Sequence, residues 1–209
     1  MKQWNDDHPK AKLMNRKRAA ILLAAKNAFL DAGYDKTSME SIAKSADVSI
    51  MTLYRHARSK DELFAAVTSS ACEPTDSVEL AKLEAIMALP LPDALYQTAI
   101  HMQQTLLKDD SIALIRLAVS EASRFPRLSE LAYEGFIERL INVTAWILSQ
   151  IEPASGLDKP ERIALAEAFV DRLVGTNLIR ALLGLSSASP AEVQERAARA
   201  RDAVLQRFS

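Results

Sequence analysis

The sequence predicts an all-α protein of about nine helices, and three observations carry this prediction. Only 5 of the 209 residues are Gly and 8 are Pro, so few positions interrupt a helix. Hydrophobic residues make up 49% of the chain, and they recur at the spacing of three and four residues that is typical of amphipathic helices. No alternation of β-branched and polar residues is regular enough to indicate a strand. The length allows one or two domains.

The first helix is predicted over residues 16–32, where apolar residues recur at helical spacing. Gly33 follows it and can end it in a left-handed conformation. Residues 1–15 are polar and include Pro9, and we expect them to form a flexible N-terminal arm.

Two short helices joined by a tight turn are predicted next. Thr37 and Glu40 form a T-x-x-E capping box, which starts the first of them. Residues 47–49 interrupt this helix, because Asp tolerates turn conformations and Ser49 can cap the second helix, residues 50–57.

A second capping box, formed by Ser59 and Glu62, begins a further helix at Asp61. The two short helices and their turn indicate a helix-turn-helix, whose second helix enters the major groove of DNA in known examples. Residues 1–72 contain 12 Lys and Arg against 8 Asp and Glu, whereas residues 73–209 contain 14 against 19. A basic N-terminal module on an acidic body suits a protein that contacts phosphate with one end only.

Residues 42–64 read IAKSADVSIMTLYRHARSKDELF. This segment resembles the N-terminal DNA-binding signature of the tetracycline-repressor (TetR) family of bacterial transcriptional regulators, which runs roughly I-A-x-x-A-G-V-S-x-x-T-L-Y-x-H-F-x-S-K-x-x-L. Asp47 stands where that signature has glycine, and Asp can adopt the left-handed turn conformation. Ala57 stands where it has phenylalanine, which removes an apolar anchor between the third and fourth helices.

The resemblance and the helical geometry together assign DNA-binding residues. On the helix that begins near Ser49, Leu53 points inward. Positions that face the bases in the family correspond to Ile50, Met51, Thr52 and Arg55. Phosphate-binding positions correspond to Tyr54, His56 and Lys60, and further contacts to phosphate at helix starts are expected from Thr37, Ser38 and Ser49.

Three of these assignments have alternatives. Ile50 and Met51 can contact thymine methyl groups, or Ile50 packs against the protein and reads nothing. Arg55 can contact guanine or a phosphate. His56 is expected to form hydrogen bonds and not to bind a metal, because the other histidines are distant in sequence and no cysteine lies nearby.

The rest of the chain is predicted to be helical. A break at Cys72-Glu73-Pro74 separates the fourth helix from one that runs from near Val78 to the residue before Pro90. Asp158 and Ser189 each precede a proline and a Glu at the third helical position, which indicates capping boxes. Further helices are expected near residues 93–108, 111–124, 127–151, 160–184 and 190–207.

Residues 116–136 read RLAVSEASRFPRLSELAYEGF and resemble the C-terminal domain of an AefR-like subgroup within the TetR family. The two resemblances imply a flexible arm in residues 1–15, a helix-turn-helix domain in 16–72 and a regulatory and dimerisation domain in 73–209. They also imply a homodimer through residues 160–207, where the helix over residues 160–184 carries two apolar stripes. The alternative is that both stripes are buried within one subunit.

The helix over residues 131–151 is apolar almost all round, so we expect it to be buried centrally, beside a site for a small and largely apolar effector. Candidate ligand-binding residues are Tyr96, His101, Met102, Gln104, Arg116, Phe136, Asn142 and Trp146. By resemblance, the effector would move the fourth helix, change the spacing of two DNA-reading heads and release a palindromic operator. The chain is therefore expected to be a repressor.

Common enzyme motifs are not found in the sequence: there is no Gly-rich phosphate loop, no H-E-x-x-H and no nucleophile elbow. We expect no enzymatic activity, no cofactor and no bound metal. Two alternatives are an all-α enzyme with a structural helix-turn-helix, and a DNA-binding regulator controlled by a protein partner or by no effector. The single cysteine, the lack of an apolar run of the ~20 residues that span a bilayer and the polar N-terminus favour a cytoplasmic location, away from membranes.

Overall fold

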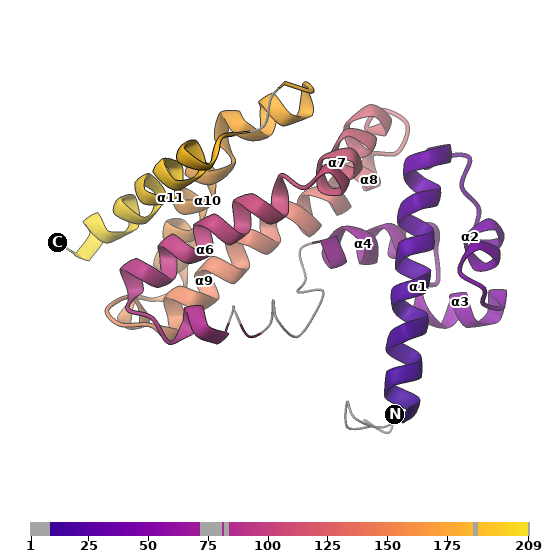
Figure 1. Ribbon diagram of the computed structural model, residues 1–209, viewed down its shortest axis with the longest axis horizontal. Helices are drawn as coiled ribbons and strands as arrows, with labels where there is room; N and C mark the ends of the chain where they lie inside the picture. Colours follow the sequence, from indigo (N-terminus) through magenta and orange to yellow (C-terminus); the bar gives the residue numbers. More distant parts are fainter. Residues whose placement is uncertain (1–8, 72–80, 82–83, 186–187, 209) are drawn as a thin grey trace. The chain divides into compact units, whose positions relative to one another are not determined.

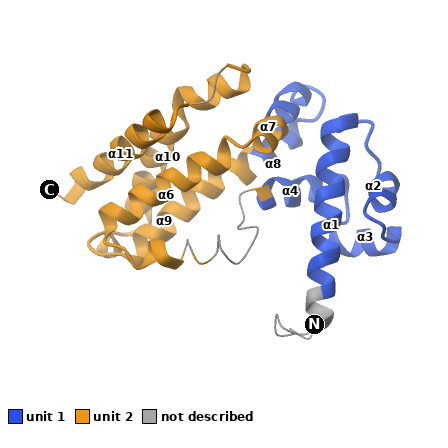
Figure 2. Ribbon diagram, viewed as in Figure 1, with its two compact units in different colours: residues 1–70, 116–132 blue, residues 71–115, 133–209 orange. Residues whose placement is uncertain are grey.

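The computed structural model describes residues 9–71, 81, 84–185 and 188–208. Within this part of the chain the regular structure is entirely helical, as predicted, with ten α-helices, one π-helical segment and two 3-10 turns (Figure 1). None of the described helices is long and apolar enough to cross a membrane. The chain divides into two compact units (Figure 2): unit 1 is residues 1–70 with 116–132, and unit 2 is residues 71–115 with 133–209.

Unit 1 contains the helix-turn-helix and its bracing helix. Its helices are α1 (Pro9–Ala32), α2 (Met39–Ser45), α3 (Ile50–His56) and α4 (Lys60–Ala71), together with the end of α7 (Asp109–Glu121) and most of α8 (Pro126–Tyr133). Residues 9–15 belong to α1, which contradicts the flexible arm expected for them. Proline suits the first turn of a helix, where its missing N–H is not needed. Residues 1–8 of the expected arm lie outside the described residues.

The cap of α2 lies one residue later than predicted. Ser38 is the N-cap, and its Oγ accepts from the Ser41 N–H at 3.1 Å while Ser41 Oγ accepts from the Ser38 N–H at 3.3 Å. The predicted box of Thr37 and Glu40 is therefore wrong. Thr37 is 4% exposed and donates its hydroxyl to the carbonyl oxygens of Ala28 and Gly33, at 2.9 and 2.7 Å.

The turn between α2 and α3 confirms the prediction for Asp47, which has a φ of 51°. Ser49 caps α3, because its Oγ accepts from the Thr52 N–H at 3.2 Å. At the start of α4, Ser59 Oγ accepts from the Glu62 N–H at 3.1 Å, as predicted. The return bond of this box differs, since Glu62 Oε2 accepts from the N–H of Arg58 at 2.7 Å.

Aromatic rings form the core of unit 1. Phe29 and Phe64 are fully buried and meet edge to face, with ring centroids 5.5 Å apart. Tyr34 stacks on Phe29 at 5.5 Å and meets Phe64 and Phe125 edge to face at 5.9 and 5.2 Å. Residues 125–131 are also tied to the N-terminal helices by a hydrogen bond of 3.5 Å from Thr68 Oγ1 to the Leu131 carbonyl. Segments far apart in sequence thus share one core.

Unit 2 contains the start of α7 and four further helices: α6 (Leu91–Leu106), α9 (Arg139–Gln150), α10 (Lys159–Leu182) and α11 (Pro190–Leu205). α11 packs against α6 and α10, and α10 packs against α9. The capping boxes predicted at Asp158 and Ser189 are confirmed. The predicted helix over residues 127–151 is present as α8, a π-helical segment over Glu134–Glu138 and α9 in direct succession. The predicted break at residues 72–74 lies outside the described residues.

The expectation that residues 131–151 are buried on all sides is wrong for one protomer. Tyr133, Val143 and Trp146 are 53%, 37% and 54% exposed. Ala166, Phe169, Val170 and Leu173 of α10 are buried, whereas Ile179 and the C-cap residue Leu183 are 57% and 70% exposed. A single protomer therefore does not bury both stripes of α10 along their whole length.

The ring cluster should account for much of the stability of unit 1. Replacement of Phe64 by Ala should cost about 3–5 kcal/mol, because it removes a large buried ring and leaves a cavity. Leu23, 55% exposed on α1, is the matched control, and Leu23→Ala should cost less than about 0.5 kcal/mol. Urea unfolding followed by circular dichroism measures both variants. Equal losses would contradict the central role of the rings.

Candidate nucleic-acid interface

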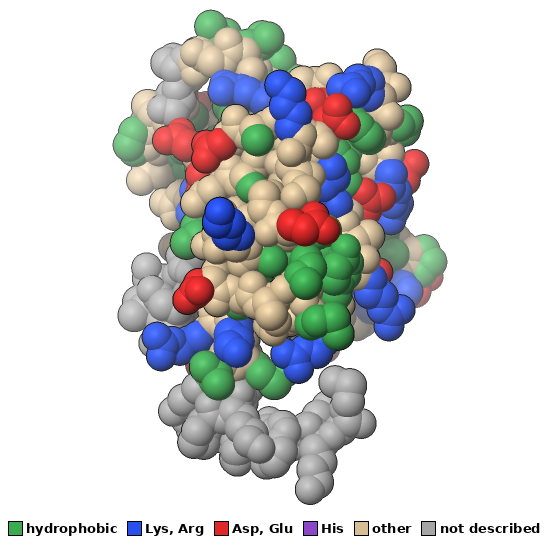
Figure 3. Space-filling view, turned by 90° about the vertical axis from the view of Figure 1, so that its right-hand side faces the viewer, with side chains coloured by type: hydrophobic (Ala, Val, Ile, Leu, Met, Phe, Trp, Pro, Cys, Tyr) green, Lys and Arg blue, Asp and Glu red, His purple; other side chains and the backbone are tan. Residues whose placement is uncertain are grey.

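α3 presents one face to solvent and one to the core. Leu53, fully buried, fixes the helix beside the equally buried Ile42. Met51 is 74% exposed, Tyr54 is 43% exposed, and Arg55 is exposed as well. Ile50 is only half-buried, so it lies between the two faces. Figure 3, which faces the side of unit 1 on the right of Figure 1, shows hydrophobic side chains gathered on part of this surface with Lys and Arg side chains beside them.

Thr52 does not face outward, which corrects the expectation from the sequence. Its side chain is 8% exposed, and its Oγ1 lies 2.9 Å from Ser49 Oγ. The same Oγ1 accepts a hydrogen bond of 3.2 Å from Arg55 Nη2. The hydroxyl of Thr52 thereby connects Ser49, the N-cap of α3, to the guanidinium of Arg55, which is the best candidate for a base contact. Thr52 therefore orients Arg55 instead of offering its own hydroxyl.

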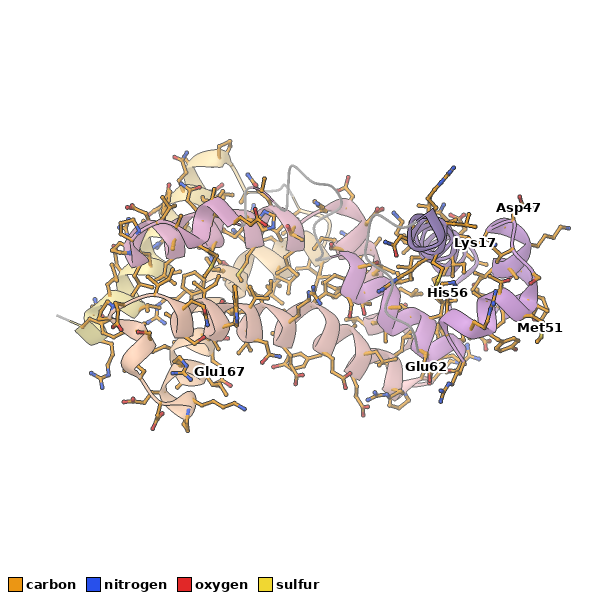
Figure 4. All side chains as sticks on the ribbon, turned by 90° about the horizontal axis from the view of Figure 1, so that it is seen from below. Lys17, Asp47, Met51, His56, Glu62 and Glu167 are labelled. Atoms are coloured by element: carbon orange, nitrogen blue, oxygen red, sulfur yellow. The ribbon has the colours of Figure 1, made fainter. Side chains whose placement is uncertain are left out.

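A group of cations surrounds the end of α3. Lys17 and Arg18, both exposed on α1, act electrostatically on His56 together with Arg55. Figure 4 shows Lys17 and His56 on the same side of unit 1. Burial lowers the pKa of the half-buried His56, and the positive charges of Arg55, Arg18 and Lys17 lower it further. Several cations held this close together repel one another, and a phosphate group would relieve that repulsion. This surface is therefore suited to an anionic backbone.

Lys60 and Thr37, both expected at phosphate, are engaged inside the protein. Lys60 Nζ donates to the carbonyl oxygens of Tyr34, Thr37 and Asp35, at 2.7, 3.1 and 3.3 Å. It also lies 4.3 Å above the centre of the Tyr34 ring. These contacts use all three donors of the ammonium group. Lys60 thus holds the turn before α2, and the hydroxyl of Thr37 is committed to α1.

The serines of the expected interface act as caps. Ser38 and Ser49 are exposed and begin α2 and α3, where their hydroxyl oxygens accept from the N–H groups of Ser41 and Thr52. Lys17, Arg18 and Tyr34 were not among the predicted site residues. The run Arg16-Lys17-Arg18 in the sequence was the available signal for the first two, whereas nothing local indicates the role of Tyr34.

The eight candidate ligand residues do not gather in one place. Met102 and Phe136 are buried, Tyr96 and His101 are half-buried, and Gln104, Arg116, Asn142 and Trp146 are exposed. Arg116 belongs to unit 1, while the others belong to unit 2. A small cavity in unit 2 is lined by Met102, Gln103, Leu106, Leu107, Leu140, Leu173 and Val174. Of the eight candidates, Met102 lines this cavity.

The hydroxyl of Thr52 should matter for sequence discrimination. Thr52→Val keeps the shape of the side chain but removes the acceptor that orients Arg55, so binding to a specific site should weaken about three- to tenfold while binding to unrelated DNA stays unchanged. Fluorescence anisotropy with the two DNAs at equal salt measures this. Ser70→Ala, which removes a hydroxyl bonded to the Val67 carbonyl, should change neither. Equal weakening on both DNAs would contradict the orienting role.

His56 should make folding sensitive to acid. Because the pKa of His56 is lower in the folded than in the unfolded chain, protonation favours unfolding, and stability falls as the pH drops through the unfolded value of ~6.5. Wild-type protein should therefore lose more stability between pH 7.5 and pH 5.5 than His56→Gln. Urea unfolding at the two pH values tests this, and parallel losses in the two proteins would refute it.

Family models match both parts of the chain. The model of bacterial regulatory proteins of the tetR family matches residues 21–67, and that of the C-terminal domain of AefR-like transcriptional repressors matches residues 93–209. The HTH-type transcriptional activator FasR of Mycolicibacterium smegmatis is 43% identical over 53 residues, which make up 25% of this chain and 24% of that protein. The matched segment thus spans about a quarter of that relative.

Solved structures resemble almost the whole chain. A protein from Mesorhizobium loti MAFF303099 assigned to the TetR family of transcriptional regulators is 28% identical, with a TM-score of 0.68 and coverage of 92% of this chain and 96% of that one. The flavonoid-responsive regulator FrrA is also 28% identical, with a TM-score of 0.65 and coverage of 92% and 97%. The helix-turn-helix and these matches show that the chain belongs to the TetR family of DNA-binding transcriptional regulators, and that it is not an enzyme.

Proposed function

We propose that the chain binds a palindromic operator as a homodimer, represses transcription there and is released by a small, largely apolar effector. The observation that carries the proposal is the construction of α3. Its exposed face bears Met51, Tyr54 and Arg55, and the exposed cations Lys17 and Arg18 lie beside its end.

The dimensions of α3 suit the major groove. Seven residues make a helix of about 10 Å, which fits a groove about 12 Å wide. In this pose Met51 would contact thymine methyl groups and Arg55 the edge of a guanine, while Tyr54, His56 and Ser38 would contact phosphates. The half-buried Ile50 stays a second candidate for thymine contact.

A homodimer would place two such heads on one operator. One module makes few contacts, and half-sites of known helix-turn-helix dimers lie about 34–36 Å apart or a multiple of that distance. Ile179, Leu183 and Leu185 are 57%, 70% and 52% exposed, so the region of residues 160–207 offers apolar surface to a second copy. Apolar side chains of this size are commonly covered at homodimer interfaces.

Effector control would work by a shift between conformers. The cavity in unit 2 is small and has room for about one water molecule. An effector would therefore bind a conformer in which this region is open, and it would favour the change of spacing that weakens DNA binding. The alternative is control by a protein partner. It would be favoured if the protein stayed bound to DNA in the presence of every small molecule tested.

The experiment is a footprint and gel shift on the DNA that flanks the gene for this protein. Wild-type protein should protect a palindrome, and Arg55→Ala should bind it about tenfold or more weakly, in line with the 1–3 kcal/mol of a bidentate base contact. Lys108→Ala, an exposed cation of unit 2 outside residues 160–207, should bind normally. Replacing thymine by uracil in the half-sites should weaken the wild type but not Met51→Ala. In vitro transcription from the same fragment shows whether the protein represses or activates transcription, and activation would contradict the proposed repression.

The dimer makes a separate prediction. Leu183→Glu puts a charge on the most exposed apolar residue of this region, and it should convert the dimer into monomers and weaken operator binding at least tenfold. Light scattering after size exclusion measures the mass. Leu23→Glu introduces the same change at a comparably exposed residue of α1 and should leave the mass unchanged. A dimeric Leu183→Glu protein would place the interface elsewhere.

A further inference from the structure

A buried polar pair in unit 2 has unused donors. Asn177 of α10 is 8% exposed, and its Oδ1 accepts a hydrogen bond of 3.1 Å from Nη2 of Arg196 of α11. Because arginine only donates, this bond fixes which amide atom of Asn177 is oxygen. Asn177 Nδ2 and Arg196 Nε are buried and have no partner within the described residues. Buried donors without acceptors are costly, so this pair is suited to receive an acceptor group.

The backbone of α10 makes room for the guanidinium. At Gly175 the φ and ψ angles are 33° and −141°, which interrupts the helix. A Cβ at this position would lie 3.1 Å from Arg196 Nη1. Any larger residue would therefore press on the guanidinium as well as strain the backbone. The kink and the glycine together define the place that Arg196 occupies.

The carboxylate of Glu192, one turn earlier on α11, acts electrostatically on Arg196 without forming an ion pair with it. Arg199 and Arg201, on the same helix, form ion pairs with Glu195 and Asp202. Arg196 is half-buried, and no carboxylate of the described residues forms an ion pair with it. Its Nε and Nη2 lie on one edge of the planar group, which is the arrangement that binds a carboxylate with two hydrogen bonds. An anion is therefore the acceptor that fits this pair best.

The apolar cavity of unit 2 and the polar pair share the segment of α10 around Gly175. Two of its lining residues, Leu173 and Val174, directly precede Gly175, against which Arg196 lies. Gln103 also lines the cavity, is 2% exposed, and donates from Nε2 to the Ala99 and Val193 carbonyl oxygens, at 3.2 and 3.1 Å. Its unpartnered Oε1 is an acceptor, which would repel an anion. The charged end of a ligand would thus lie at Arg196 and its apolar body in the cavity.

We propose that Arg196, Asn177 and this cavity form a binding site for a small amphipathic carboxylate. The carboxylate accepts from Arg196 Nε and Nη2 and from Asn177 Nδ2, while the apolar body separates the leucine and methionine side chains of the lining. The inference rests on the proposed function, because it names the chemical class of the effector. Since the cavity has room for about one water molecule, binding selects a conformer of unit 2 in which the cavity is larger.

Isothermal titration calorimetry on the full chain without DNA tests the site. The probes are hexanoate, octanoate and benzoate, each compared with the alcohol of the same carbon skeleton. Wild-type protein should bind at least one acid saturably, and at least tenfold more tightly than its alcohol. Arg196→Gln should weaken that acid about tenfold to hundredfold. Arg199→Gln is the matched control, since Arg199 is an exposed arginine of the same helix, and should bind as the wild type does. Arg196→Lys keeps the positive charge but lacks the planar edge, so its affinity for the acid should lie between those of the wild type and Arg196→Gln.

Several results would overturn the proposal: no binding of any of the three acids, equal binding of acid and alcohol, or equal weakening in both glutamine variants. Light scattering adds a further test, because a monomeric Arg196→Gln protein would assign the guanidinium to the contact between subunits. Operator gel shifts separate this proposal from the proposed function. A specific shift without acid binding overturns the carboxylate site alone, whereas acid binding without any specific shift supports the site and overturns the operator-binding regulator.

Discussion

The surroundings of Tyr34 are the constraint on which the DNA-reading unit depends. Its ring contacts three phenylalanines, its hydroxyl donates to Asp61, and the ammonium of Lys60 lies above it. Burial and the carboxylate of Asp61 raise the pKa of Tyr34 above its usual range, so the hydroxyl stays a donor. One side chain thereby joins α1, the start of α4 and the turn before α2.

Local chemistry made much of unit 1 predictable, and tertiary contacts decided the rest. Asp47 and Ser49 act within a few residues of themselves, so their roles could be read from the sequence. Thr37 and Ser38 are adjacent hydroxyl residues, and a cap can begin at either. The choice is made by the hydrogen bond from Thr37 to Ala28 on another helix, which no local pattern contains. Lys60 was assigned to phosphate from its place in the family's signature. The three carbonyl oxygens that its ammonium group binds lie more than twenty residues earlier, so no local pattern indicates these contacts.

In unit 2 the helices were predictable, but the neighbours of their faces were not. Caps at Asp158 and Ser189 are local signals, and both were found. An apolar face indicates burial without naming what covers it. Trp146 was assigned to a ligand site on a helix expected to be buried, and Leu183 belongs to one of the two apolar stripes of the helix over residues 160–184, yet both are exposed in one protomer. Gly175 lies in an otherwise regular helical pattern, where a glycine is tolerated with or without a kink. Its role depends on an arginine 21 positions later, beyond the range of periodicity arguments.

The composition of unit 1 from two separate stretches has a consequence for synthesis on the ribosome. Residues 1–70 leave the exit tunnel well before Phe125 and Leu131, which supply a ring contact to Tyr34 and a carbonyl acceptor to Thr68. The ion pair of 3.0 Å between Asp35 and Arg124 also cannot form until this stretch has been synthesised. The nascent DNA-reading head therefore lacks part of its core until residue 132 has emerged, by which time α6 is already made. Its completion depends on translation of part of the C-terminal half, and a gene fragment that stops near residue 70 encodes an unfinished head.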